Sequence, residues 1–133
     1  MSRELIENYY RAFNAEDHAG MLALLSDDVV HDINQGAREA GKAKFAAFLK
    51  HMEACYRERL ENIVIMASAD NTRFAAELVV HGTYLKTDTG LPAANGQTYV
   101  LPAGAFLEVA HGKITRVTTY YNLQDWLKQV GAA

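Results

Sequence analysis

The sequence lacks several features that would point to particular classes of protein. Its 133 residues include one cysteine, Cys55, so no internal disulfide can form and a reducing compartment is expected. Thirteen basic residues stand against sixteen acidic ones, giving a net charge of −3. The basic residues form no stripe, so we do not expect nucleic acid as a partner.

Long apolar runs are missing as well. No stretch approaches the ~20 apolar residues that a membrane-spanning helix needs, so no membrane partner is expected. The first ten residues, MSRELIENYY, are charged and helical in pattern and contain no apolar core followed by a cleavage site. We therefore expect a cytoplasmic protein.

Metal and nucleotide sites lack their usual spacing. No two of the five histidines stand four residues apart on a helix, and no second cysteine can join Cys55. The glycines at positions 36, 41, 90 and 96 form no phosphate-binding loop ahead of a helix. We therefore expect no metal and no cofactor, and Cys55 is predicted to be a small packing residue in a helix.

What the sequence does contain is typical of one globular domain over residues 1–133. Half of the residues are hydrophobic and 22% are charged. Apolar residues at helical spacing predict helices over 2–13, 17–25, 42–56 and 123–130. β-branched content predicts a strand over 29–34, and apolar runs separated by turn residues predict strands over 61–68, 73–84, 98–110 and 113–122. Helices followed by a set of antiparallel hairpins indicate an α+β fold.

The strand predicted over 73–84 is apolar on both faces. Its polar side chains, Arg73, Glu77 and His81, all fall on one face, among apolar neighbours. A sheet that is apolar on both faces has to be covered twice. Because the helices can cover only one face, we expect a homodimer that forms through the open face of the sheet.

Asp32 is the first candidate for chemistry. Strand alternation divides its neighbours into two faces: Val30, Asp32 and Asn34 on one, and Val29, His31 and Ile33 on the other. If the first set faces the interior, desolvation raises the pKa of Asp32, as a proton-abstracting base requires. Alternatively, Asp32 is exposed, or is capped by loop amides around Gly36. The pattern leaves both interpretations open.

Tyr9 is the second candidate. Helical spacing places it on the buried face of the first predicted helix. A phenol there can donate a hydrogen bond to a developing oxyanion. It can equally be a core residue whose hydroxyl is already satisfied. The pattern leaves this open too.

Three motifs resemble a known family. They are YYRAFNAEDHAGMLALLSDDVVHDI near the start, GTYLKTDTGLPAANGQTYVLPAGAF later in the chain, and HGKITRVTTYYN near the end. With them the chain resembles the nuclear-transport-factor-2-like (NTF2-like) superfamily, in its ketosteroid isomerase-related and SnoaL-like polyketide cyclase branch. The resemblance implies a cone-shaped, curved antiparallel sheet whose helices enclose one pocket. It covers most of the chain and specifies the fold more closely than the reaction, because this fold hosts many functions.

Carried onto this sequence, the isomerase pattern implies that Asp32 is the catalytic base and Tyr9 the oxyanion donor. Its second donor, a protonated aspartate, falls on Gly104, and its supporting helix tyrosine falls near Leu49, so both are missing. SnoaL-like cyclases often carry an acidic residue near the end of the last strand. In this sequence Asn122 stands close to that position, which weakens the cyclase interpretation. The same registration implies a set of substrate-binding positions: Val30, Asn34, Phe48, Leu78, Val80, Phe106, Val117, Thr119 and Tyr121.

These observations lead to one expected function and three alternatives. We expect an isomerase-type enzyme in which Asp32 removes a proton α to a carbonyl of a small apolar ligand, while Tyr9 binds the enolate oxygen. The first alternative is a non-catalytic module that binds a hydrophobic ligand, and the second is a SnoaL-like polyketide cyclase. In the third, Phe13, Phe48 and Phe106 fill the pocket and no ligand binds.

Overall fold

The computed structural model describes residues 2–131 and has an α+β architecture, which confirms the predicted fold class. The elements follow in the order α1 (Ser2–Asn14), α2 (His18–Ala23), β1 (Leu25–Asp32), β2 (Arg38–Ala40), α3 (Lys42–Cys55), β3 (Tyr56–Ala67), β4 (Arg73–Tyr84), β5 (Thr98–Ala110), β6 (Lys113–Tyr121) and α4 (Leu123–Gln129).

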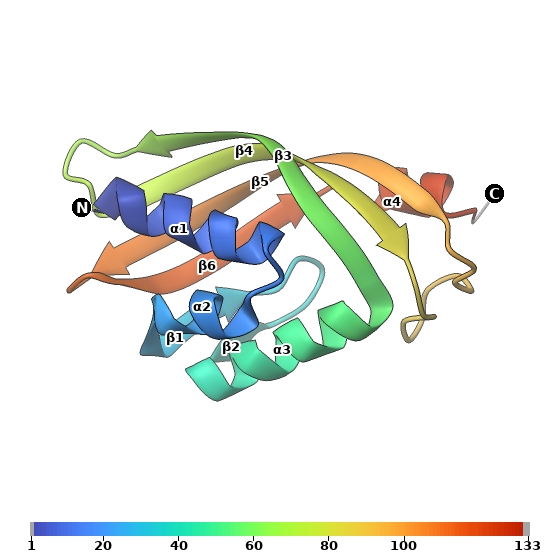
Figure 1. Ribbon diagram of the computed structural model, residues 1–133, viewed down its shortest axis with the longest axis horizontal. Helices are drawn as coiled ribbons and strands as arrows, with labels where there is room; N and C mark the ends of the chain where they lie inside the picture. Colours follow the sequence, from blue (N-terminus) through green and yellow to red (C-terminus); the bar gives the residue numbers. More distant parts are fainter. Residues whose placement is uncertain (1, 132–133) are drawn as a thin grey trace.

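The strands form one six-stranded sheet in the order β2-β1-β6-β5-β4-β3. The sheet curves without closing, and α1, α2 and α3 lie on its concave side (Figure 1). All neighbouring pairs are antiparallel except β1 and β6, which run parallel. The expected sheet was antiparallel throughout. The difference arises because most of the chain, and not a hairpin, separates β1 from β6, so nothing requires them to run in opposite directions.

Two short segments differ from the predicted strands. β2 has three residues and lies within the stretch expected to be loop. β3 begins at Tyr56, directly after α3, although we expected it to begin near residue 61. Charged side chains at positions 57–59 weaken the strand pattern there, but their backbone pairs with β4, with Tyr56 opposite Tyr84. Pairing with a neighbouring strand outweighs local propensity in such a segment.

The two faces of the sheet differ in what covers them. Along β4 the even-numbered residues are buried under the helices, and the odd-numbered residues face the convex side. The convex side carries large exposed apolar side chains from three strands: Val64, Met66, Val100, Phe106 and Tyr120. We call these five residues the convex apolar face. The expected homodimer would bury it, and that dimer stays a prediction.

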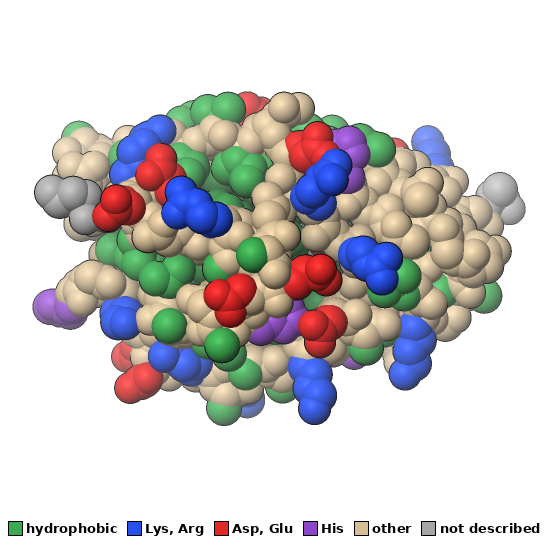
Figure 2. All heavy atoms as spheres, viewed as in Figure 1, with side chains coloured by type: hydrophobic (Ala, Val, Ile, Leu, Met, Phe, Trp, Pro, Cys, Tyr) green, Lys and Arg blue, Asp and Glu red, His purple; other side chains and the backbone are tan. Residues whose placement is uncertain are grey.

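The outer surface of the helical side is mixed in charge. Figure 2 shows acidic and basic side chains interspersed over this face, so no extended field of one sign covers it. Within residues 2–131, no helix combines the length and the apolar character needed to cross a bilayer.

Candidate functional site

A cavity of about 440 Å³ lies between the concave face of the sheet and the helices. Ligand pockets in proteins commonly measure ~300–1,000 Å³. The wall is largely apolar: α1 contributes Tyr9 and Phe13, α3 contributes Phe48, Leu49 and Met52, and the sheet contributes Leu78, Val80, Leu101 and Val117. The interpretation in which phenylalanines fill the pocket is therefore wrong, because Phe13 and Phe48 leave this space open and Phe106 lies outside it.

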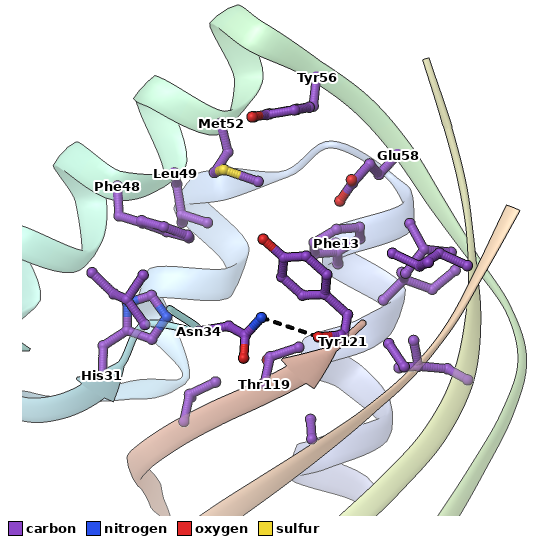
Figure 3. Close-up of a pocket in the computed structure, with 18 of the residues that line it drawn as sticks. Phe13, His31, Asn34, Phe48, Leu49, Met52, Tyr56, Glu58, Thr119 and Tyr121 are labelled. Atoms are coloured by element: carbon purple, nitrogen blue, oxygen red, sulfur yellow. Dashed lines mark hydrogen bonds between the residues drawn. The ribbon is translucent and has the colours of Figure 1, made fainter. Parts of the chain in front are cut away.

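Most of the predicted binding positions face this cavity. Those that line it are Asn34, Phe48, Leu78, Val80, Val117, Thr119 and Tyr121, together with Tyr9. Figure 3 shows the Tyr121 ring reaching from the end of β6 towards Leu49 and Met52 of α3, with Asn34 below it. The Asn34 amide donates a hydrogen bond to the Tyr121 carbonyl oxygen at 3.2 Å. Whether these residues bind a substrate stays a prediction.

Two predicted positions, Val30 and Phe106, lie elsewhere. Phe106 pairs with Ala75 and Thr118 and is 48% exposed on the convex face. The residues of β5 that line the cavity are Leu101, Ala103 and Ala105. Val30 is opposite Ala40 of β2 and does not line the cavity. In both strands the registration was shifted by one residue, which moves a side chain to the opposite face.

Asp32 borders the cavity, but its carboxylate is bonded on the convex side. The register aligns Asp32 with Thr118, whose hydroxyl donates to Asp32 Oδ2 at 2.6 Å. Arg38 Nε donates to Oδ1 at 2.6 Å. The hydrogen bonds from Arg38 and Thr118 outweigh desolvation and, with the charges of Arg38 and Arg116, hold the pKa of Asp32 well below its usual 3.8. The expected rise in the pKa of Asp32 is therefore wrong, and this carboxylate is a weak base at neutral pH.

His31 occupies the inward position that was considered for Asp32. It is buried, and its ring centroid lies 4.7 Å from that of Phe45 and 4.5 Å from that of Phe48. Its Nδ1 is buried, and no group within residues 2–131 forms a hydrogen bond with it. Burial lowers the pKa of His31, although Glu39 and Asp32 oppose this, so the imidazole is neutral at pH 7.

The sequence contained a signal for this orientation of β1. The strand was predicted to begin at Val29, but it begins four residues earlier, at Leu25. Over its full length the odd positions include Leu25 and Val29, both buried, and the even positions include Ser26 and Asp28. Counting apolar residues on both faces of the longer strand would have favoured His31 as the inward residue.

Glu58 is a second residue of the site that the sequence reasoning missed. It lies on β3 and lines the cavity (Figure 3). The Tyr99 hydroxyl donates a hydrogen bond to Glu58 Oε2 at 2.5 Å. Burial raises the pKa of Glu58, and the hydrogen bond from Tyr99 offsets part of the rise. The residue was overlooked because β3 was predicted to begin after it; alternation of Tyr56, Glu58 and Leu60 is the signal that places it inward.

Other polar groups of the wall are joined to Asp88, in the loop between β4 and β5. The Tyr56 hydroxyl donates to Asp88 Oδ2 at 2.7 Å, and His51 Nε2 lies 2.9 Å from Asp88 Oδ1. The backbone amide of Asp88 donates to the Tyr84 hydroxyl at 3.0 Å. These bonds hold the loop between β4 and β5 against the end of α3 and the start of β3.

Tyr9 was the predicted oxyanion donor, and that role stays a prediction. It lines the cavity and is only 5% exposed. Burial, assisted by the neighbouring Tyr10, raises the pKa of Tyr9, so its hydroxyl is neutral and remains a hydrogen-bond donor.

An α+β fold in which helices cover the concave side of a curved sheet, with an apolar cavity between them, defines the NTF2-like class. The comparisons with known proteins agree with this class. The chain belongs to the SnoaL-like domain family, whose model matches residues 6–117.

Solved structures support the same assignment. A "putative polyketide cyclase" from Pseudomonas putida KT2440 is 62% identical to this chain, covers 98% of both chains and has a TM-score of 0.96. A second structure with that description, from Xanthomonas campestris pv. campestris, is 58% identical over 98% of this chain and 96% of its own, with a TM-score of 0.94. An NTF2-like protein from Burkholderia xenovorans LB400 is 16% identical over 98% of this chain and 95% of its own; its TM-score of 0.77 shows the shared fold alone. The search of curated proteins found no match.

Proposed function

We propose that this protein is an enzyme that removes a proton α to a carbonyl group of an apolar ligand bound in the cavity, with the Glu58 carboxylate as the base. The observation that carries the proposal is a carboxyl group set in an apolar wall, bonded by one neutral hydroxyl, with a raised pKa. A general base is most effective when its pKa approaches the working pH. Glu58 takes the role that the sequence had suggested for Asp32.

The proton transfer balances with groups that line the cavity. The α C–H bond breaks, its proton passes to Glu58, and its electron pair moves onto the carbonyl oxygen as an enolate. Burial raises the pKa values of Tyr9 and Tyr121, so both phenols remain protonated and can donate hydrogen bonds to that oxygen. Such donors stabilise the charge that develops in the transition state.

The enolate can continue in two ways. Returning the proton to another carbon isomerises the ligand, and attack of the enolate carbon on a second carbonyl closes a ring. Two structural relatives are each described as a "putative polyketide cyclase". Their descriptions favour ring closure of a polyketide-like compound over isomerisation of a steroid ketone for this chain.

The experiment measures the step that both reactions share. Apolar cyclic ketones such as 2-tetralone are incubated with the protein in D2O, and loss of the α-proton signal is followed by NMR. We expect the wild type to accelerate exchange and Glu58→Gln to lower the rate by ~10²-fold or more, because a general base contributes roughly 10²–10⁴-fold. The matched control is Glu77→Gln, which makes the same change at an exposed position of β4.

The dependence on pH follows from the raised pKa of Glu58. Its value in the folded protein lies above its usual 4.5, so the exchange rate should fall as the pH decreases through that higher value and the base becomes protonated. Unchanged exchange in Glu58→Gln would overturn the assignment of this base.

A binding module without turnover is the second candidate function. β5 presents Ala103 and Ala105 to the cavity, so this strand places no acidic oxyanion donor there. The binding module would be favoured if the ketone quenches the fluorescence of Trp126, which lines the cavity, while neither the wild type nor any variant accelerates exchange.

A further inference from the structure

Three side chains of types that commonly bind metals lie close together beside the cavity. His51 and Cys55 lie one turn apart at the end of α3, and Asp88 comes from the loop between β4 and β5. Their ligand atoms all lie within 4.8 Å of one another. His51 Nε2 is 2.9 Å from Asp88 Oδ1 and 4.0 Å from Cys55 Sγ.

The surroundings hold the Asp88 carboxylate in place. Burial by itself would raise the pKa of Asp88, but hydrogen bonds from Tyr56 and His51 outweigh burial and lower it, so the group is ionised at neutral pH. Tyr56 occupies Oδ2, and the backbone amide of Thr89 donates to Oδ1 at 2.9 Å. Outer partners of this kind fix the orientation of a ligating carboxylate.

We propose that His51, Cys55 and Asp88 bind a divalent transition-metal ion, with zinc as the ion that suits them best. Zinc accepts thiolate sulfur, imidazole nitrogen and carboxylate oxygen in one tetrahedral site, at bond lengths of ~2.0–2.3 Å. Tetrahedral geometry at these bond lengths separates the ligand atoms by roughly 3.3–3.8 Å. The His51–Asp88 separation lies below this range, the His51–Cys55 separation lies above it, and the Asp88–Cys55 pair lies within 4.8 Å, so shifts of the side chains complete the site.

Binding also balances in charge and protons. The S–H bond of Cys55 breaks, a sulfur–metal bond forms, and the proton passes to the solvent. The His51–Asp88 hydrogen bond breaks as well: the imidazole loses its proton at Nε2 to the solvent and takes one up at Nδ1, so that Nε2 and the Asp88 carboxylate each bind the metal. Burial and the charge of Asp88 raise the pKa of the Cys55 thiol, with Lys86 opposing them. A divalent cation at this point reverses that balance and favours the thiolate.

The bound ion would lie beside the cavity and next to the loop between β4 and β5. His51 and Asp88 line the cavity, whereas Cys55 lies behind them, buried at the end of the helix. The three protein ligands leave the fourth tetrahedral position for water or a ligand oxygen. The ion would also join α3 to the loop between β4 and β5. No metal was expected because only histidine pairs and a second cysteine were considered; the spacing of four between His51 and Cys55 on a helix is the signal that was missed.

Cobalt(II) titration of the tag-free protein tests the proposal without any substrate. Because Cys55 is the only cysteine in the sequence, a thiolate-to-cobalt charge-transfer band in the near ultraviolet can come from this site alone. We expect that band at one cobalt per chain, together with visible bands typical of tetrahedral cobalt, and we expect zinc to displace both. The outcome is independent of the proposed enzymatic function, because the spectrum reports binding and not turnover.

Variants distinguish the site from unspecific binding. Cys55→Ser should abolish the charge-transfer band, and His51→Ala and Asp88→Asn should each weaken cobalt affinity by ~10-fold or more. His111→Ala, at an exposed turn, is the matched control and should bind as the wild type does. A wild-type protein without the charge-transfer band at saturating cobalt, or an Asp88→Asn variant with full affinity, would overturn the proposal. Asp88→Asn preserves the buried thiol, so this variant still tests the site if Cys55→Ser fails to fold.

Discussion

At the scale of single residues, the neighbours of two carboxyl groups shift their pKa values in opposite directions. Asp32 is bonded by two arginines and a threonine hydroxyl, and its pKa falls. Glu58 has one neutral partner, Tyr99, in an apolar wall, and its pKa rises. When their environments shift the pKa values of two acids in opposite directions, the acid with the lowered pKa suits a structural role and the acid with the raised pKa suits proton transfer.

The structural role of Asp32 leads to a prediction about stability. Asp32→Asn removes the charge that Arg38 and Arg116 share, so we expect the free energy of unfolding at pH 7 to drop by about 1–2 kcal/mol, in the range of hydrogen bonds to charged groups. Asp28→Asn is the matched control, since Asp28 is an exposed acid of the same strand. Urea unfolding followed by circular dichroism measures both variants.

The same substitution has a defined dependence on pH. The pKa of folded Asp32 lies below its usual 3.8, so its stabilisation is complete above that value and is lost as the pH falls towards the folded pKa. The wild type should therefore lose stability more steeply than Asp32→Asn below pH 3.8. Parallel loss in both proteins would show that the charge of Asp32 contributes nothing.

Single residues also show where prediction from sequence succeeds. Leu78, Val80, Val117 and Thr119 were placed in the cavity by registration onto the family motifs, and all four line it. The same registration misplaced Phe106, and alternation could not correct it, because the residues around it in β5 are apolar in both parities. Cross-strand pairing, which fixes that register, is not contained in the pattern of one strand.

At the scale of elements, β3, β4 and β5 together position Glu58. Tyr99 of β5 lies opposite Gly82 of β4, and its hydroxyl reaches across to Glu58 of β3. A Cβ atom at position 82 would lie 2.2 Å from Tyr99 Cζ. The absent side chain of Gly82 is thus what lets the ring cross the middle strand.

Gly82→Ala should therefore displace the Tyr99 ring from Glu58. Overpacking of this kind costs about 1–3 kcal/mol, which urea unfolding measures. Loss of the hydrogen bond that lowers the pKa of Glu58 should raise that pKa further, as followed by NMR titration of the carboxyl carbon.

Gly104→Ala is the matched control for this substitution. A Cβ atom there meets only the Ala76 carbonyl oxygen, at 3.8 Å, which is an ordinary contact. Equal unfolding free energies and an unchanged Glu58 pKa in both variants would contradict the account of Gly82.

Elements were predicted well where their signals are local. The bounds of β4 and β5 match the predicted ranges because turn residues enclose long, mainly apolar runs. The cap of α2 is also local: the Asp17 side chain accepts a hydrogen bond from the Gly20 amide at 2.9 Å. β2 was missed because its three residues become a strand only by pairing with β1.

At the scale of the whole molecule, the α+β class followed from the order of helical and strand patterns, and the motif resemblance gave the cavity its place. The parallel pairing of β1 with β6 did not follow, because those strands are brought together by packing of the entire chain. The convex apolar face was anticipated from one strand, Arg73–Tyr84, although the largest side chains on it come from β3, β5 and β6.

That face leads to the prediction of a homodimer. Phe106 and Tyr120 pack edge to face, with ring centroids 5.9 Å apart, and are 48% and 55% exposed. Val64 and Met66 of β3 extend the apolar surface across the sheet. Contiguous apolar surface of this kind typically marks an interface, and a second copy offers a matching face by symmetry.

We expect sedimentation at micromolar concentration to give twice the 14.7 kDa chain mass. Phe106→Glu places a charge at the centre of the proposed interface and should yield a folded monomer, because an unpaired buried charge is strongly unfavourable. Ala47→Glu makes the same change in charge on an exposed position of α3 and should remain dimeric. A monomeric wild type would remove the dimer altogether, whereas a dimeric Phe106→Glu variant would move the interface away from the convex face.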